Sequence, residues 1–170
     1  MINERVSELL NQQFNKELYS AYLYLDFSNY FERNGLGGFA NWYRVQTQEE
    51  RDHAMLFYQY MQNNAVRVRL DAVDAPVVNA ESTMDVLRAG LAHEEYVTSL
   101  INTIYEAALE SKDFRTMQFL DWFVKEQGEE EATARGLIEK MDLCGNDPKA
   151  LFLLNQELAE RSYSAPSFKL

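Results

Sequence analysis

Residues 48–54, Gln48-Glu49-Glu50-Arg51-Asp52-His53-Ala54, decide the fold because they put two metal-ligand side chains into an apolar helical pattern. Around this stretch, inward-facing residue types recur at alternating steps of three and four, the spacing of one helix face. They are Phe39, Tyr43, Gln46, Glu50, His53, Phe57 and Tyr60. Glu50 and His53 stand three residues apart and are therefore neighbours on that face. The pattern predicts a helix whose inward side carries a carboxylate and an imidazole.

The spacing around Glu50 and His53 is repeated later in the chain. Two sets of residues have it: Glu17, Glu50 and His53, and then Glu94, Gln127 and Glu130. In each set the first two residues are 33 positions apart, and the third follows three residues after the second. The midpoint of the first pair falls at the turn signal Asn34-Gly35, and that of the second falls beside Ser111. Residues equidistant from a reversal lie at one height in an antiparallel helix pair, so two such hairpins would bring six ligand-type side chains to one level.

Capping residues and turn signals divide the chain into four long helices and one short one. The expected helices run from the capping residue Asn3 to about Arg33, from after Gly38 to about Asn63, from the capping box Ser82-Thr83-Met84-Asp85 to the reversal near Ser111, from Asp113 to Gly145, and from Asp147-Pro148 through Leu158. The tail from Ser162 is expected to fray.

Between the second and third helices lie 19 residues, 64–82, which include Pro76 and show no helical period. At roughly 3.3 Å per extended residue they can cover the length of a helix of about 40 Å, so the second and third helices can run parallel. The short loops at the other two junctions require antiparallel neighbours. We therefore predict an all-α four-helix bundle with one long crossover between helices two and three and a short C-terminal fifth helix.

Composition supports a single globular domain, residues 1–170, with 46% hydrophobic and 13% aromatic residues. The formal net charge of −11 argues against nucleic acid or an anionic membrane as a partner and favours cations, although a charged surface also serves solubility. No apolar stretch reaches about 18 residues, so no membrane span is expected. The single cysteine, Cys144, cannot form an internal disulfide, and the polar run from Met1 to Arg5 is unlike a signal-peptide core, so we expect a cytoplasmic protein.

Carboxylates and an imidazole on apolar stripes have two interpretations, a buried polar network or a metal site. A Glu-x-x-His motif by itself is weak and is usually a surface coincidence. However, a buried ionised group costs several kcal/mol unless it is paired or metal-bound, and a core has no structural use for four glutamates at one level: Glu17, Glu50, Glu94 and Glu130. We therefore favour two adjacent metal ions, which require carboxylates that can bridge them.

At these residues the chain resembles the bacterial non-haem ferritins over nearly its whole length. The matching segments are Glu17-Leu18-Tyr19-Ser20-Ala21-Tyr22-Leu23-Tyr24, Gln48-Glu49-Glu50-Arg51-Asp52-His53-Ala54, His93-Glu94 and Glu126-Gln127-Gly128-Glu129-Glu130-Glu131. The resemblance implies a ferritin-like bundle with two iron ions and these ligands: Glu17, Glu50 and His53 for one, Glu94, Glu130 and a bridging Glu50 for the other, with Gln127 beside them. It also implies a homo-oligomeric cage of 24 chains that oxidises Fe(II) with O2 or peroxide and stores the iron as a ferric mineral.

Related families differ from this chain at informative positions. The bacterioferritins have a second Glu-x-x-His, where this chain has Gln127-x-x-Glu130, and a methionine after the first glutamate, where it has Arg51, so no haem is expected. Rubrerythrins add a cysteine-rich iron domain, which one cysteine cannot build. The remaining alternatives are a bacterioferritin-like or other di-iron oxidase without a storage role, and a structural bundle without metal.

Further residues receive smaller roles. Tyr24, on the first helical stripe, is either an ordinary core tyrosine or a catalytic residue that hydrogen-bonds a ligand or supplies an electron, and the resemblance favours the catalytic role. Glu49, Glu126 and Glu129 flank the ligands. By themselves they indicate a solvated acidic face, whereas the resemblance implies a third iron site. His93 points about 100° away from the ligand face of its helix and is expected at the surface or at an interface.

Overall fold

The computed structural model of the chain describes residues 2–168, so residues 1 and 169–170 of the expected domain lie outside the described part. Within residues 2–168 the chain forms helices and no strands, as predicted. The helices are α1 (Glu4–Arg33), α2 (Gly37–Asn63), α3 (Thr83–Glu110), α4 (Phe114–Cys144) and α5 (Pro148–Ala159). None of the helices in this described range is long and apolar enough to cross a membrane.

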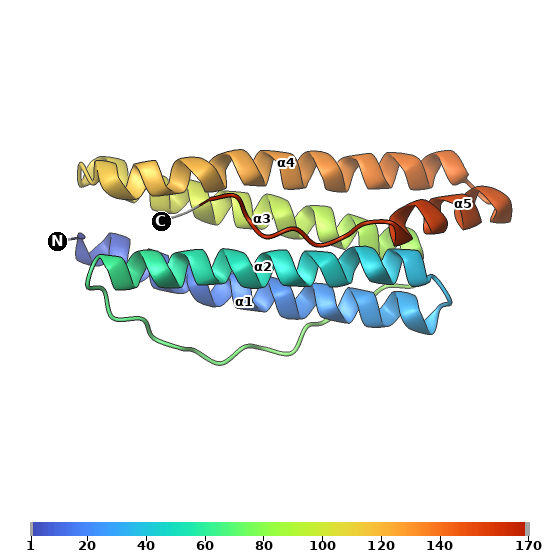
Figure 1. Ribbon diagram of the computed structural model, residues 1–170, viewed down its shortest axis with the longest axis horizontal. Coiled ribbons are helices and arrows are strands. Elements are labelled where there is room, and N and C mark those ends of the chain that lie inside the picture. Colours follow the sequence, from blue (N-terminus) through green and yellow to red (C-terminus); the bar gives the residue numbers. More distant parts are fainter. Residues whose placement is uncertain (1, 169–170) are drawn as a thin grey trace.

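The four long helices form two antiparallel hairpins joined by the crossover (Figure 1). Residues 64–82 run along the bundle from one end to the other, so α2 and α3 point the same way, which confirms the predicted topology. Two asparagines of α1 hold the crossover backbone in place. Asn11 Oδ1 accepts a hydrogen bond from the Arg69 amide at 2.6 Å, and Asn15 Nδ2 donates to the Arg69 carbonyl at 3.0 Å. These side chains satisfy backbone groups that have no helix or sheet partner.

The helix ends match their sequence signals closely. Asn3, Asp113 and Asp147 each accept a backbone N–H of the first turn that follows, and Ser82 forms a reciprocal capping box with Asp85. Such contacts satisfy amides that lack a partner within the helix. The boundary of α2 was predicted wrongly, because the helix begins at Gly37 and not after Gly38.

The start of α2 is capped by a residue of α5. Leu36 stands at the N-cap and makes no side-chain capping bond. Instead, Asn155 Oδ1 accepts hydrogen bonds from the amides of Gly38 at 2.8 Å and Phe39 at 3.3 Å. A Cβ atom at Gly38 would lie only 1.6 Å from the Asn155 carbonyl oxygen. The glycine therefore lets α5 approach closely enough to cap α2.

The apolar core consists of two clusters separated by a polar level. One cluster is built from residues within 6–14, 54–61, 97–108 and 119–123, and the other mainly from residues within 23–31, 39–43, 86–87 and 137–144 of the same four helices. In each helix the ligand-type residues fall between these two segments. Glu17, Glu50, His53, Glu94 and Gln127 are all buried there. Close-packed aromatic rings on both sides, such as Phe57 and Phe31, keep this level at a fixed height.

The tail after α5 was predicted to fray, and this prediction is wrong. Residues 161–168 are not helical, but they run back along the bundle between α2 and α4 (Figure 1). The Arg161 guanidinium lies over the Trp42 ring, 4.1 Å from its centroid. At the other end of the tail the Phe168 ring stacks on Trp122 with a centroid distance of 5.5 Å. The tail is thus anchored at both of its ends.

The close approach at Gly38 generates a stability prediction. Replacing Gly38 by alanine should destabilise the protein by about 1–3 kcal/mol through overpacking against Asn155, although alanine is favoured over glycine in helices by about 1 kcal/mol. Thermal unfolding measures the change. Gly37→Ala is the matched control, because a Cβ there would meet no atom within 4 Å. Equal stability of the two variants would show that α5 can withdraw from Gly38 without cost.

Candidate metal centre

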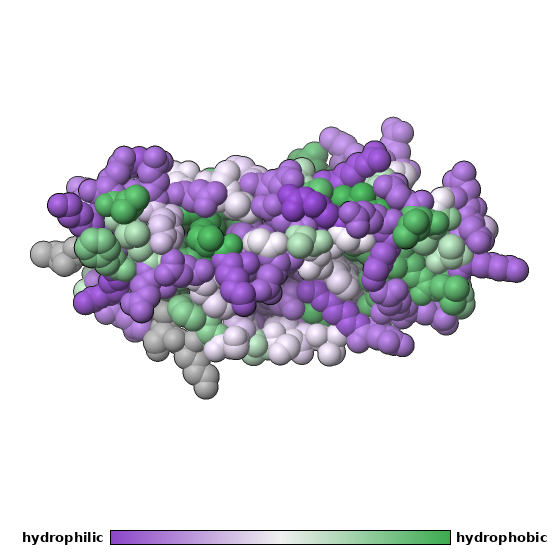
Figure 2. Space-filling model, turned by 90° about the horizontal axis from the view of Figure 1, so that it is seen from above, coloured by the Kyte–Doolittle hydropathy of each residue, from purple (hydrophilic) through white to green (hydrophobic). Residues whose placement is uncertain are grey.

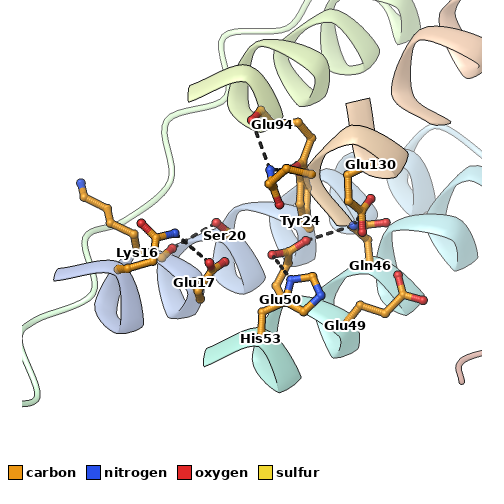
Figure 3. Close-up of polar contacts among 12 residues, drawn as sticks. Lys16, Glu17, Ser20, Tyr24, Gln46, Glu49, Glu50, His53, Glu94 and Glu130 are labelled. Carbon is orange, nitrogen blue, oxygen red and sulfur yellow. Dashed lines mark hydrogen bonds and ion pairs between the residues drawn. The ribbon is translucent and has the colours of Figure 1, made fainter. Parts of the chain in front are cut away.

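Three buried side chains from α1 and α2 converge at the polar level (Figure 3). Glu17, Glu50 and His53 each offer one ligand atom, and these atoms lie within 4.8 Å of one another. Their exposed fractions are 1%, 2% and 2%. His53 Nδ1 lies 3.3 Å from Glu50 Oε2. The helical spacing of three residues holds Glu50 and His53 on one face, and the α1–α2 hairpin brings Glu17 beside them.

The Glu17 carboxylate has an unsatisfied oxygen. Gln13 Nε2 donates to Oε1 of Glu17 at 2.7 Å, while Oε2 is buried and has no hydrogen-bond partner. A buried carboxylate oxygen without a partner carries a desolvation cost that a cation would offset. Oxygen donors together with an imidazole suit iron and similar divalent ions. The residues of this level therefore fit an iron-binding centre.

A second group of potential ligands shares His53 with the first. His53, Glu126 and Glu130 bring one ligand atom each to within 4.8 Å of one another. The two groups are linked by Gln46, whose Nε2 donates to Glu50 Oε1 at 3.0 Å and to Glu130 Oε2 at 2.9 Å. The sequence pattern placed Gln46 on the inward stripe but assigned it no role. Its position one helical turn before Glu50 is the signal that would have identified it.

Glu94 and Gln127 form the α3–α4 side of the centre. Gln127 Nε2 donates to Glu94 Oε2 at 3.2 Å and to the Glu94 carbonyl oxygen at 3.3 Å. The Tyr24 hydroxyl donates to Glu94 Oε1. Among the described residues, Glu94 belongs to neither group of three convergent ligands. Tyr24 and Gln127 hold Glu94 by hydrogen bonds, which offset part of the repulsion from the neighbouring carboxylates.

Protons offset part of the negative charge of the centre. Burial raises the pKa of Glu17 to about 8, and the Glu50 carboxylate adds to the shift. Burial and Glu50 likewise raise the pKa of Glu94 to about 7 and hold the pKa of Glu130 well above its ordinary value. For His53, burial by itself would lower the pKa, but the Glu50 carboxylate beside it raises the pKa to about 10. Burial by itself would raise the pKa of Glu50, but the charge and hydrogen bond of His53 lower it.

His93 lies beside Ser20 and Tyr24 at the edge of the centre. It is partly buried, and its Nε2 is 2.8 Å from the Ser20 hydroxyl oxygen. Its ring meets Tyr24 edge-on, with a centroid distance of 5.7 Å. The sequence predicted a surface or interface position for His93, and the turn of the helix places the half-buried ring between α1 and α3. It supports Tyr24 and belongs to neither ligand group.

The three glutamates assigned to a third site occupy different surroundings. Glu126 lies with His53 and Glu130. Glu49 instead forms an ion pair with Arg161, with Nη2 2.6 Å from Oε2. Glu129 is exposed and lies 3.2 Å from the Lys125 ammonium. The part played by Arg161 was missed, because it lies 112 residues from Glu49 and no sequence spacing relates the two.

Iron binding is expected to release protons, because burial and neighbouring charges keep protons on several of the ligands. Glu17, Glu94 and His53, with pKa values of about 8, 7 and 10, must lose their protons before their ligand atoms can bind a cation. Protons therefore compete with metal, and lowering the pH from about 8 to about 6 should weaken anaerobic Fe(II) binding by roughly tenfold per unit for each proton displaced. Calorimetry in two buffers of different ionisation enthalpy counts the protons. Fe(II) binding that neither depends on pH nor releases protons would contradict this account.

Comparison with known proteins agrees with this geometry. A family model described as a ferritin-like domain matches residues 7–144. The chain is 39% identical to a bacterial non-heme ferritin of Campylobacter jejuni, covering 92% of this chain and 93% of that protein. It is 35% identical to a bacterial non-heme ferritin of Staphylococcus epidermidis, covering 96% of this chain and 99% of that protein.

Among solved structures, an engineered closed form of the Archaeoglobus fulgidus ferritin superposes with a TM-score of 0.94 at 44% identity, covering 96% of this chain and 100% of that one. The open-pore ferritin of the same archaeon gives a TM-score of 0.93, also at 44% identity, and the match covers 95% of this chain and 100% of that one. The chain therefore belongs to the ferritin family.

Proposed function

We propose that this chain is an iron-storage ferritin with ferroxidase activity, which oxidises Fe(II) to Fe(III) at the buried centre and stores it as a ferric mineral. The observation that carries the proposal is the convergence of Glu17, Glu50 and His53. One carboxylate oxygen of Glu17 is buried there without a hydrogen-bond partner. Glu130, which is assigned below to the second ion, lies directly beside this group and shares the amide of Gln46 with Glu50. Two adjacent ions are what a two-electron oxidation by O2 or peroxide requires.

The substrate ions are assigned to the ligands that the family resemblance implies. One Fe(II) is assigned to Glu17, Glu50 and His53, which converge here. The other is assigned to Glu94, Glu130 and a bridging Glu50, with Gln127 hydrogen-bonded to Glu94. Each Fe(II) gives up one electron, and the oxidant accepts both. Gln46, which donates to both Glu50 and Glu130, orients the carboxylates that lie between the two ions. Loss of the ligand protons lets these carboxylates turn toward iron.

Tyr24 is assigned a catalytic role in this reaction. Its hydroxyl donates to Glu94, and its ring is almost completely buried, with an exposed fraction of 1%. Burial, together with the neighbouring Glu94 and Glu50 carboxylates, raises the pKa of Tyr24, so the phenol keeps its proton. A protonated phenol in contact with a ligand can orient that ligand. It can also pass an electron, together with its proton, to O2 when the reduction of O2 goes beyond the two electrons that the Fe(II) ions give.

The cavity at the centre favours iron oxidation over oxidation of an organic substrate. The space lined by Tyr24, Tyr43, Glu94 and Glu130 has a volume of about 20 Å³. A cavity of this size holds about one water molecule. A space of this size suits a small oxidant better than an organic substrate.

A homo-oligomeric cage follows from membership of the ferritin family, and we assign it 24 chains, located in the cytoplasm. Exposed apolar side chains support subunit contacts. Leu143, Phe152 and Leu153 are exposed by 88%, 58% and 64%. Figure 2 shows apolar side chains gathered toward the end of the molecule where α4 meets α5, on a face that is otherwise largely hydrophilic. As partners we assign Fe(II), O2 or peroxide and further copies of the chain, and we expect neither haem nor nucleic acid among them.

A third iron site is part of the proposal, formed by Glu49, Glu126 and Glu129. Its support is that Glu126 already lies with His53 and Glu130 at the edge of the two-ion site. Burial raises the pKa of Glu126, as expected for a carboxylate that faces the centre. A site made of carboxylates without histidine is a hard oxygen site, which suits the transfer of Fe(III) onward from the centre.

Removal of a ligand should abolish rapid oxidation without loss of the particle. Glu94→Ala and His53→Ala should slow the initial rate of Fe(II) oxidation by more than the roughly 10–100-fold cost of losing a supporting contact. Stopped-flow absorbance after mixing with Fe(II) in air measures the rate, and light scattering measures assembly. Glu95→Ala is the matched control, because this exposed neighbour of Glu94 faces away from the centre. Unchanged rates would refute the ligand assignment, and a monomer or simple dimer as the sole native species would refute the cage.

Neutralisation of the third site should affect iron transfer and spare the first oxidation. In a Glu126→Gln/Glu129→Gln double variant we expect a changed number of irons oxidised per O2 or slower later turnovers, with a normal fast first phase. Oxygen-electrode titration and multi-turnover kinetics measure these quantities. Glu139→Gln/Glu157→Gln, which neutralises two glutamates outside the centre, is the control. Identical stoichiometry and kinetics in the Glu126→Gln/Glu129→Gln variant would mean that these residues form only a solvated acidic face.

A further inference from the structure

We propose that Arg161 in the C-terminal tail is an internal counter-ion of the Glu49 carboxylate. A metal ion at the third site then binds Glu49 only by displacing Arg161. This inference rests on the third site proposed above. It adds a residue from a different part of the chain, which would control when that site is complete. Two independent features carry it: the position of Glu49 outside the ligand groups, and the contacts that hold Arg161 on it.

The position of Glu49 is the first feature. Glu49 is adjacent to Glu50 in sequence, yet within residues 2–168 it belongs to neither group of convergent ligands. Its side chain points away from Glu50 and His53 (Figure 3). The Arg161 guanidinium lies on its carboxylate at 2.6 Å, and the two side chains are exposed by only 19% and 21%. The contact is a charge-assisted hydrogen bond that is partly shielded from water.

The contacts of Arg161 are the second feature. Its Nη1 donates to Gln46 Oε1 at 3.0 Å and to the Trp42 carbonyl oxygen at 3.3 Å, and the guanidinium stacks over the Trp42 ring. Asn41 Nδ2 fixes the backbone here by donating to the carbonyl oxygen of Arg161 at 2.9 Å. Hydrogen bonds at its edges and the Trp42 ring on one face fix the flat guanidinium against the Glu49 carboxylate. A lysine would not reproduce these contacts.

The bond to Gln46 connects Arg161 with the two-ion site. The Gln46 amide accepts from Arg161 through Oε1 and donates through Nε2 to Glu50 and Glu130. When those carboxylates turn toward iron, Gln46 loses acceptors and its bond with Arg161 loosens. Iron in the two-ion site would therefore favour release of Glu49 to a third ion. The hydrogen bonds from Arg161 through Gln46 to Glu50 and Glu130 would thus make the two-ion site fill before the third site.

The tail is built to keep Arg161 close after it leaves Glu49. Beyond Arg161, the Tyr163 hydroxyl donates to Asp52 on α2, and Phe168 stacks on Trp122 of α4. These contacts hold the tail between α2 and α4 at points separate from Arg161. Displacement thus requires movement of one long side chain and not release of the whole tail.

Anaerobic Fe(II) binding tests the proposal, measured by competition with a chromophoric chelator so that no oxidation is involved. Arg161→Gln should raise the affinity for the third ion by about five- to tenfold, the strength of a partly shielded charge-assisted contact, while the first two ions bind nearly as before. Arg161→Lys, which keeps the charge but not the fork, should give a smaller rise. Arg44→Gln is the matched control, because it removes another arginine–glutamate ion pair, between Arg44 of α2 and Glu32, which lies on the exposed surface. Light scattering checks that each variant assembles.

A second background shows whether the effect passes through Glu49. In Glu49→Gln, the further change Arg161→Gln should leave the affinity for the third ion unaltered. A rise that persists there, or equal third-ion affinity in the unaltered protein and Arg161→Gln, would overturn the role of Arg161. If the unaltered protein and Arg161→Gln bind only two ions per chain, the third site and this inference both fail. If the third ion binds and responds to Glu126→Gln/Glu129→Gln but not to Arg161→Gln, only this inference fails.

Discussion

Like charges buried at one level of a helix bundle repel one another, and this repulsion explains how the side chains around Glu50 are arranged. Protons on Glu17 and Glu94, a charged His53 and the amides of Gln46 and Gln127 together reduce the cost of the buried carboxylates. Each of these compensations is weaker than a divalent cation. Iron that binds at this level would displace these protons and hydrogen bonds.

The two apolar clusters give that arrangement its fixed geometry. Ring stacking between Tyr60 and Phe119 on one side and between Phe31 and Tyr43 on the other leaves the helices little freedom to move apart. A rigid frame holds the ligands in place even though their buried carboxylates repel one another. Stability is thus concentrated in the apolar clusters, and chemistry is confined to the polar level between them.

The C-terminal part of the chain completes both the frame and the centre. Asn155 of α5 caps α2, and Arg161 reaches the carboxylate of Glu49 on the same helix. Both contacts join positions that are more than a hundred residues apart, and both act on α2, which carries Glu50 and His53. The short helix and the tail are therefore part of the functional unit and are not accessory extensions.

Much of the fold follows from local signals in the sequence. The caps at Asn3, Ser82, Asp113 and Asp147 mark helix starts because they satisfy amides a few residues away, and such contacts need no distant partner. The paired spacing of Glu17 with Glu50 and of Glu94 with Gln127 determines which side chains meet, because an antiparallel hairpin converts equal distance from a turn into equal height. Only the tertiary structure decided where α2 begins and that Glu94 turns toward Tyr24. It also decided the contact of the half-buried His93 with Ser20 and the pairing of Glu49 with Arg161. These features depend on contacts between elements far apart in the chain and on the balance of buried charges, and neither leaves a periodic pattern in the sequence.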